Sequence, residues 1–558
     1  MNDRLSGRRC GLLLSLCLPL WLTACGGGGG PSASVSGSED PNPVRQGASR
    51  YQAAEVTRRV TTSDGSGNSL DQALAIVDLE TGTEVRRIAL DADVSGSAWQ
   101  AVGRYDAPSA TQGRRLGASM VLYVAQGQLM QLALDHTSLG APSAVSGPQQ
   151  VCGIDQLHPL NLAGSQAWLL VQTPGPDGLC REQRDNTRLW VATGVPGAAQ
   201  GLQAEGPGAK TLVGPLASAW GATAAGVLAI DRQEGSLGVY SLDLQRRLST
   251  VALGRPVGPD EDVETYPWMP GNPARLLLRV GDTLSLAEVT EGQLRVLKTL
   301  RTLRPGSFIK LAQSDTERFL VDGMSIIAIN AQGDVRNVGQ VTAGAESVEG
   351  LAYAAGRVIV TLRQRSAPGK ATVLSLRATD SAPALLMGDG DQSYIALLAV
   401  TEDQVWFSRT QSATGLQEIV RMAPDGQGYT TIATNVNGAD VLPASQFTLP
   451  HLNTPAALVW CLPQAAARTC TGATLQRHLL PNGPTVTLGN PVPDERWTWG
   501  LLSYDPLQPG GLPSVVTAML YLSDTLPSGA SRQTDQAVLL WMDPNSAASL
   551  RPVARLQP

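Results

Sequence analysis

Short apolar segments alternate with tight polar turns along most of this chain. Segment 74–79 leads through a Gly-containing turn into segment 85–90, and segment 276–280 leads in the same way into segment 284–289. Segment 239–244 is a further example. Runs of four to eight apolar residues bounded by polar turns are typical of buried β-strands, whereas helices need a longer 3.6-residue period. The pattern therefore predicts an all-β fold.

The apolar segments recur at a spacing that indicates repeated sheets. Successive anchor positions lie about 40–63 residues apart, the length of a four-stranded blade with variable loops. The anchors lie near Leu79, Leu132, Trp190, Leu242, Leu286, Ala328, Leu376, Met422, Arg477 and Leu540. We expect a β-propeller of roughly seven to ten blades, with eight as the expected number because some anchors can belong to insertions. An array of β-sandwiches is the structural alternative.

Three turns carry a shared signature. Segments 78–82, 231–235 and 330–333 begin with Asp or Asn and end with Gly. The first side chain can cap such a turn, and Gly can adopt the positive φ that closes it. The first of these turns resembles the Asp-x-x-Thr-Gly turn of quinoprotein-type propeller repeats. In that family the pattern continues to a Trp that docks between blades, whereas Arg86 stands near that place here. The resemblance implies a propeller without a bound quinone, and we expect no cofactor.

The N-terminus carries an export signal. Three arginines among the first nine residues precede a short apolar segment, 11–22. The last residue of this segment begins the sequence Leu-Thr-Ala-Cys at 22–25. This sequence resembles the lipobox of bacterial lipoproteins. The resemblance implies that a thioether-linked lipid is attached to Cys25 and that the signal peptide is cleaved just before it. An ordinary secretory signal with a chance Cys, or an uncleaved anchor, is the alternative.

A flexible tether is predicted behind the lipid site. Five consecutive glycines, 26–30, precede a stretch rich in Ser, Pro, Gly and Asn. Such a stretch cannot bury enough apolar surface to offset its ordering entropy. We therefore expect a signal peptide at 1–24, a disordered tether at 25–50 and a propeller at 51–558. Gly rather than Asp follows Cys25, which in lipoproteins of two-membrane bacteria implies the outer membrane, facing the periplasm.

The composition excludes several classes of protein. The 558 residues include 42 Lys and Arg against 48 Asp and Glu, a formal net charge of −6, so a nucleic-acid partner is not expected. A hydrophobic content of 42% argues against a disordered chain. None of the four histidines has a known metal-binding spacing, so we expect no metal.

The cysteine count predicts disulfides. Two of the seven cysteines leave with the predicted signal peptide, and the lipid site accounts for a third. The four that remain are Cys152, Cys180, Cys461 and Cys470. An even number in an exported chain indicates disulfide bonds, and three pairings are possible. We expect the two local bonds, Cys152–Cys180 and Cys461–Cys470, because each pair borders a turn-rich stretch. A metal site is the alternative, although the chain has no Cys-x-x-Cys motif.

One acidic and aromatic segment is a candidate for partner binding. It contains Asp260, Glu261, Asp262, Glu264, Tyr266 and Trp268. Trp and Tyr are enriched at interface hot spots, and acids beside them can steer a basic partner. The alternative is a charged loop followed by a Trp that packs in the core between blades.

The sequence favours a binding protein over an enzyme. The lipid anchor, the tether and the repeats predict a non-enzymatic envelope propeller that presents loops to an envelope protein partner. The alternative is an enzyme or a carbohydrate-binding protein with its site in the central channel, because propeller enzymes can assemble a site from separate blades.

Overall fold

A computed structural model describes part of the chain. The described residues are 50–61, 68–91, 98–106, 114–134, 138–145, 150–159, 166–174, 178–180, 187–193, 210–215, 227–231, 234–240, 246–258, 261–268, 275–290, 292–304, 309–341, 345–364, 370–377, 383–388, 392–411, 417–442, 457–462, 474–492, 495–504, 516–525, 531–542 and 550–557. The chain divides into two compact units, Met1–Pro41 and Asn42–Pro558, and every described residue belongs to the second. Cys25 and the predicted signal peptide and tether at 1–49 lie outside the described residues. Nothing among the described residues forms a helix of the length and apolarity that a membrane crossing requires.

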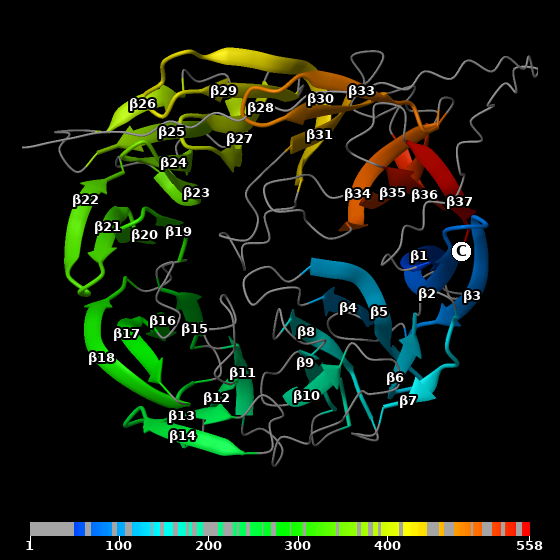
Figure 1. The fold of residues 1–558 in the computed structure, drawn as a ribbon, viewed down its shortest axis with the longest axis horizontal. Helices are drawn as coiled ribbons and strands as arrows, with labels where there is room; N and C mark the ends of the chain where they lie inside the picture. The colour runs from blue at the N-terminus through cyan, green and yellow to red at the C-terminus, as the bar shows by residue number, and fades with distance from the viewer. Residues whose placement is uncertain are drawn as a thin grey trace, which may run out of the picture. The chain divides into compact units, whose positions relative to one another are not determined.

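The described secondary structure consists of β-strands, which form antiparallel sheets in chain order (Figure 1). Two sheets have three strands each: β1 (Tyr51–Thr61), β2 (Asn68–Asp78) and β3 (Thr83–Ala89); and β8 (Gly153–Pro159), β9 (Gln166–Gln172) and β10 (Thr187–Thr193). Three of the four-stranded sheets come from the first part of the chain: β4 (Trp99–Asp106), β5 (Arg114–Ala125), β6 (Gln128–Ala133) and β7 (Ser143–Ala144); β11 (Lys210–Pro215), β12 (Val227–Asp231), β13 (Ser236–Tyr240) and β14 (Arg247–Ala252); β15 (Val263–Pro267), β16 (Arg275–Val280), β17 (Thr283–Thr290) and β18 (Gln293–Thr302).

Three further four-stranded sheets follow: β19 (Leu311–Gln313), β20 (Glu317–Asp322), β21 (Ser325–Asn330) and β22 (Val335–Gln340); β23 (Ala345–Ala354), β24 (Arg357–Gln364), β25 (Lys370–Leu376) and β26 (Ala384–Met387); β34 (Arg496–Tyr504), β35 (Val516–Thr525), β36 (Ser531–Met542) and β37 (Arg551–Leu556). A seven-stranded sheet contains β27 (Gln392–Val400), β28 (Val405–Gln411), β29 (Gln417–Met422), β30 (Thr430–Leu442), β31 (Ala457–Leu462), β32 (Thr474–Leu479) and β33 (Thr485–Gly489). Its long strand β30 pairs with β29 through its first half and with β31 through its second half. Strand β30 thus joins two four-stranded sets.

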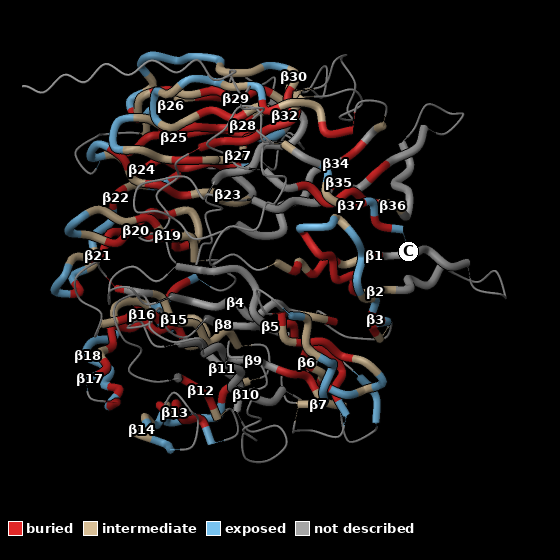
Figure 2. The backbone as a smooth tube through the Cα atoms, turned by 45° about the vertical axis from the view of Figure 1, so that its right-hand side comes forward, coloured by how far each residue is buried: buried red, intermediate tan, exposed pale blue. Residues whose placement is uncertain are grey.

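Period-two alternation places apolar side chains on both faces of the middle strands. In β2, Leu74 and Ile76 pack toward the sheet β4–β7, whereas Ala75 and Val77 pack toward β36 and β37. Successive side chains of a strand point to opposite faces of its sheet. A strand whose sheet is covered on both faces by neighbouring sheets therefore needs a continuous apolar run. The outermost strand β18 has mostly exposed residues instead. Figure 2 shows this contrast between buried middle strands and exposed outer strands.

Buried clusters of this kind join consecutive sheets. One cluster joins β15–β18 to β19–β22, another joins β19–β22 to β23–β26, and a third joins β23–β26 to β27–β29. A further cluster contains residues of the first and the last described sheets. Four-stranded antiparallel sheets that cover one another's faces are the architecture of a β-propeller, as the sequence predicts. The number of blades stays a prediction.

The capped turns have the predicted geometry. Asp78 Oδ1 accepts the backbone N–H of Glu80 at 2.9 Å, and Asn330 Oδ1 accepts that of Gln332 at 3.0 Å. The closing glycines have positive φ angles, 68° at Gly82, 62° at Gly235 and 76° at Gly333. The predicted strand 239–244 overlaps β13, Ser236–Tyr240, at two residues, and its remaining positions 241–244 lie outside the described residues. The strand starts directly after the turn that Gly235 closes.

One of the two predicted disulfides is described completely. Cys152 and Cys180 form a disulfide with their Cα atoms 5.3 Å apart, and Cys152 is buried. Cys461 is also disulfide-bonded. Cys470, its predicted partner, lies outside the described residues, so this second pairing stays a prediction.

Candidate functional site

Strand β15 carries most of the acidic and aromatic segment that the sequence singles out. Asp260 lies outside the described residues. Residues 263–267 form a strand that pairs with β16, with Glu264 opposite Arg279 and Tyr266 opposite Leu277. The charged loop that the alternative assumes is therefore a strand over these residues. Val263, Thr265 and Tyr266 are strand-forming types, and their pairing with the apolar strand β16 satisfies the backbone.

Trp268 is a core residue. Its side chain is 1% exposed and packs with Leu277, Leu286 and Leu320 between the sheets β15–β18 and β19–β22. A partner protein could reach this ring only by separating the two sheets. The predicted role of Trp268 in partner binding is therefore wrong, and the alternative of a Trp between blades is right.

The carboxylates of the segment are paired within the protein. Arg279 Nη1 lies 3.1 Å from Glu264 Oε2, and Arg279 Nη2 lies 3.4 Å from Asp262 Oδ2. Glu261 forms a two-point ion pair with Arg255, in which both N–O distances are 2.7 Å. The two arginines offset two of the three described carboxylates, so the segment carries less free negative charge than its sequence suggests.

Tyr266 completes this cluster. Its hydroxyl donates a hydrogen bond to Glu264 Oε2 at 2.6 Å. Burial raises the pKa of Tyr266 well above its usual range, and the carboxylate of Glu264 raises it further. The phenol therefore remains protonated at neutral pH and serves as a hydrogen-bond donor. The end of β15 near Asp262 is thus polar and held by ion pairs, whereas the end at Trp268 is apolar.

Arg318 lies beside Trp268, where the sheets β15–β18 and β19–β22 pack together. The sequence did not predict this residue as part of the site. It belongs to β20, is 4% exposed, and its Nε donates a hydrogen bond to the backbone carbonyl of Trp268. Arg greatly outnumbers Lys throughout this chain, so a single Arg is a weak functional signal in the sequence. The available signal was positional, since Arg318 precedes Leu320 by two residues on the same face of an apolar strand.

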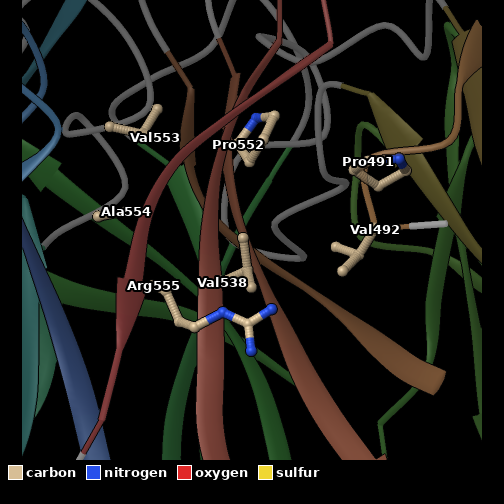
Figure 3. A pocket seen from close by; sticks show the side chains of 7 residues that line it. All are labelled: Pro491, Val492, Val538, Pro552, Val553, Ala554 and Arg555. Carbon is tan, nitrogen blue, oxygen red and sulfur yellow. The ribbon is translucent and has the colours of Figure 1, made fainter. Parts of the chain in front are cut away.

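A shallow depression lies beside the last sheet (Figure 3). It has a volume of about 200 Å³ and is lined mainly by apolar side chains, with Pro491 and Val492 facing Val538 and Pro552 in Figure 3. Its one charged lining residue, Arg555, forms an ion pair with Glu495. Among the described residues, no three His, Cys, Asp or Glu side chains are grouped closely enough to hold a metal ion.

Comparisons with known proteins show likeness only at the level of structure. No model of a protein family matches the chain, and no curated protein matches it. A structure of the eukaryotic initiation factor is 9% identical, with 78% of this chain and 96% of that chain covered and a TM-score of 0.38. The putative TolB from Agrobacterium tumefaciens is 13% identical, with 47% and 85% covered and a TM-score of 0.24. The WD40 domain of SCAP from fission yeast is 12% identical, with 59% and 84% covered and a TM-score of 0.31.

Proposed function

We propose that this protein is a lipid-anchored propeller of the bacterial cell envelope that acts as a scaffold for protein–protein interaction. The lipobox-like sequence at 22–25 and the glycine-rich tether behind it support the anchor. A tether of this composition would let the folded unit move beside the membrane that holds its lipid. The outer membrane, with the propeller facing the periplasm, is the proposed location.

The observation that carries the scaffold proposal is the fixed geometry of the turns. Asp78 and Asn330 cap their turns, and the closing glycines have the same left-handed conformation. Turns that a rigid sheet holds in place are suited to recognition, because little ordering entropy is lost when a partner binds them. The faces of the middle strands are occupied by neighbouring sheets, so we expect a partner to bind the turns rather than the faces of the strands.

The experiment combines lipid labelling with site-specific photo-crosslinking in cells. A fatty-acid analogue should label the wild-type chain and the control variant Cys17→Ala, but not Cys25→Ala. A photo-crosslinking residue at the exposed turn positions Gln332 and Gln427 should give discrete adducts, whereas the exposed outer-strand position Arg295 should not. Equal labelling of Cys25→Ala would refute the anchor, and an absence of adducts at both turn positions would refute the scaffold.

A further inference from the structure

The turn at 480–484, between β32 and β33, is fastened to the strand β29. Arg421 in β29 donates hydrogen bonds from Nη1 to the backbone oxygen of Pro481 at 3.2 Å and to Oδ1 of Asn482 at 2.7 Å. The same Oδ1 accepts a hydrogen bond from Nε2 of Gln404 at 3.0 Å. Pro481 and Asn482 are exposed, so this turn is a surface feature that two side chains of the neighbouring strands hold in place.

A second turn, 330–334, is fastened in a similar way between sheets that contain no histidine. Arg275 donates a hydrogen bond from Nη1 to the backbone oxygen of Ala331 at 3.1 Å, and Lys298 Nζ lies 3.0 Å from Asp334 Oδ1. The described residues of both sheets that meet here include no histidine. Lys298 holds the pKa of Asp334 below its usual range, so this carboxylate stays ionised at pH 5. The second turn is therefore a matched reference for the first.

A buried histidine, His478, lies directly before the turn at 480–484. Its ring is 5.0 Å from the ring of Trp406 and 6.4 Å from that of Trp460. Nδ1 shares its hydrogen bond with Thr485, but Nε2 is buried without a hydrogen-bond partner. A protonated ring needs an acceptor at each nitrogen. The docked turn therefore leaves a second proton on His478 without an acceptor.

The one charge that acts on this ring is positive. The guanidinium carbon of Arg421 lies 5.5 Å from the centre of the Trp406 ring, and its charge repels a proton on His478. Arg477, the next residue back in β32, points to the opposite face of the sheet. The strands β28, β31 and β33 present only uncharged described side chains to the ring: Trp406, Leu458, Trp460 and Thr485.

The residue that repels the proton is thus the residue that fastens the turn. Movement of the turn away from β29 would separate His478 from Arg421 and expose Nε2 to water as an acceptor. We propose that His478 makes the docking of the turn at 480–484 sensitive to pH, so that acidification releases this turn from β29 while the surrounding sheets stay folded. The use of such a release to regulate a partner rests on the proposed scaffold function.

The first test measures hydrogen exchange of single backbone amides in the full mature chain in detergent, at pH 7 and pH 5. The amide of Gly483 is bonded to the oxygen of Leu479 at 2.9 Å, and in the reference turn the amide of Gly333 is bonded to the oxygen of Asn330 at 2.9 Å. After correction for the intrinsic effect of pH, opening at Gly483 should increase by about ten- to thirtyfold at pH 5, because a released His478 titrates near its ordinary value.

The reference turn separates local release from general unfolding. Opening at Gly333 should change by less than about twofold, because no group there changes its protonation between the two pH values. An equal increase at Gly483 and Gly333 would show that the whole domain unfolds, and no increase at Gly483 would show that the turn ignores pH. Either result would overturn the proposal.

The second test changes each end of this arrangement. His478→Gln cannot bind the proton, so the pH dependence at Gly483 should vanish. Arg421→Met removes the fastening, so Gly483 should open about tenfold more at pH 7 while Gly333 stays unchanged, and Arg275→Met should do the reverse. A pH dependence that persists in His478→Gln, or unchanged opening in Arg421→Met, would overturn the proposal.

These measurements use purified protein without a partner. They can fail while the photo-crosslinking at Gln332 and Gln427 succeeds, and they can succeed while it fails. Failure of this inference is therefore distinguishable from failure of the scaffold function.

Discussion

Acidification from pH 7 to pH 5 should destabilise the protein through the buried histidine His478. Its ring is 5% exposed, shares a hydrogen bond of 2.9 Å between Nδ1 and Thr485 Oγ1, and lies 5.0 Å from the ring of Trp406. Burial lowers the pKa of His478 from 6.5 to about 4, and repulsion from the nearby Arg421 contributes to the decrease. The folded protein therefore holds this ring neutral at a pH where the unfolded chain protonates it.

The sign and size of the effect follow from these two pKa values. Above pH 6.5 the ring is neutral in both states, so the stability that neutral burial provides is fully present. As the pH falls from 6.5 toward 4, the unfolded chain binds a proton that the folded protein does not, and stability is lost. Each state contributes a factor of 1 + 10^(pKa − pH). At pH 5 this factor is about 30 times larger for the unfolded chain than for the folded protein, which corresponds to a loss of about 2 kcal/mol of folding stability.

The assay is urea-induced unfolding of the wild type and of His478→Gln at pH 7 and pH 5. Gln can retain a hydrogen bond to Thr485 but does not titrate. The wild type should lose about 1–2 kcal/mol more than the variant between the two pH values. The other histidines are present in both proteins, so their contribution cancels in the comparison. Equal losses in the two proteins, or a nuclear magnetic resonance titration that places the pKa of His478 near 6.5, would refute this reasoning.

Two further predictions concern stability. Trp268→Ala should lower the free energy of unfolding by about 3–5 kcal/mol because it empties a core site, whereas the exposed control Tyr394→Ala should change it by less than about 0.5 kcal/mol; near-equal losses in denaturant unfolding would contradict the core position. Gly235→Ala should destabilise more than Gly254→Ala in the same assay. Both glycines have positive φ, but a Cβ at Gly235 would lie 1.7 Å from the carbonyl oxygen of Arg255, whereas a Cβ at Gly254 would have no atom within 4 Å. Equal losses of stability in the two variants would show that the turn at Gly235 can move aside.

The middle strands could be predicted from the sequence because their physical signal is strong. Segment 74–79 is apolar at nearly every position, since alternate residues of β2 face different neighbouring sheets. The first strand of each sheet gave a weaker signal. Strand β15 mixes Glu264 with Tyr266, and β23 contains register shifts that interrupt its alternation. The outermost strand β18 buries little of its surface and so resembles a polar loop in sequence.

The candidate site could be predicted only in part, because charge compensation depends on contacts between distant segments. The acidic segment was recognisable, but its pairing with Arg279 comes from the register of β15 against β16. The hydrogen bond from Arg318 to Trp268 joins residues 50 positions apart. Neither residue has a motif around it that would mark the contact. Sequence reasoning could therefore identify the polar and aromatic side chains without showing which of them neutralise one another.

The way these sheets pack limits where any binding group can lie. In a middle strand such as β2, both faces are covered by neighbouring sheets, so its side chains contribute stability and are not accessible to a ligand. Accessible chemistry is restricted to turns, outer strands and the ends of inner strands. Arg318 and Trp268 both occupy strand ends, since Arg318 is the second residue of β20 and Trp268 directly follows β15. These two strand ends are nevertheless buried, because the Arg318 side chain donates its hydrogen bond to the backbone of Trp268 between the two sheets, so a strand end is not by itself an accessible position.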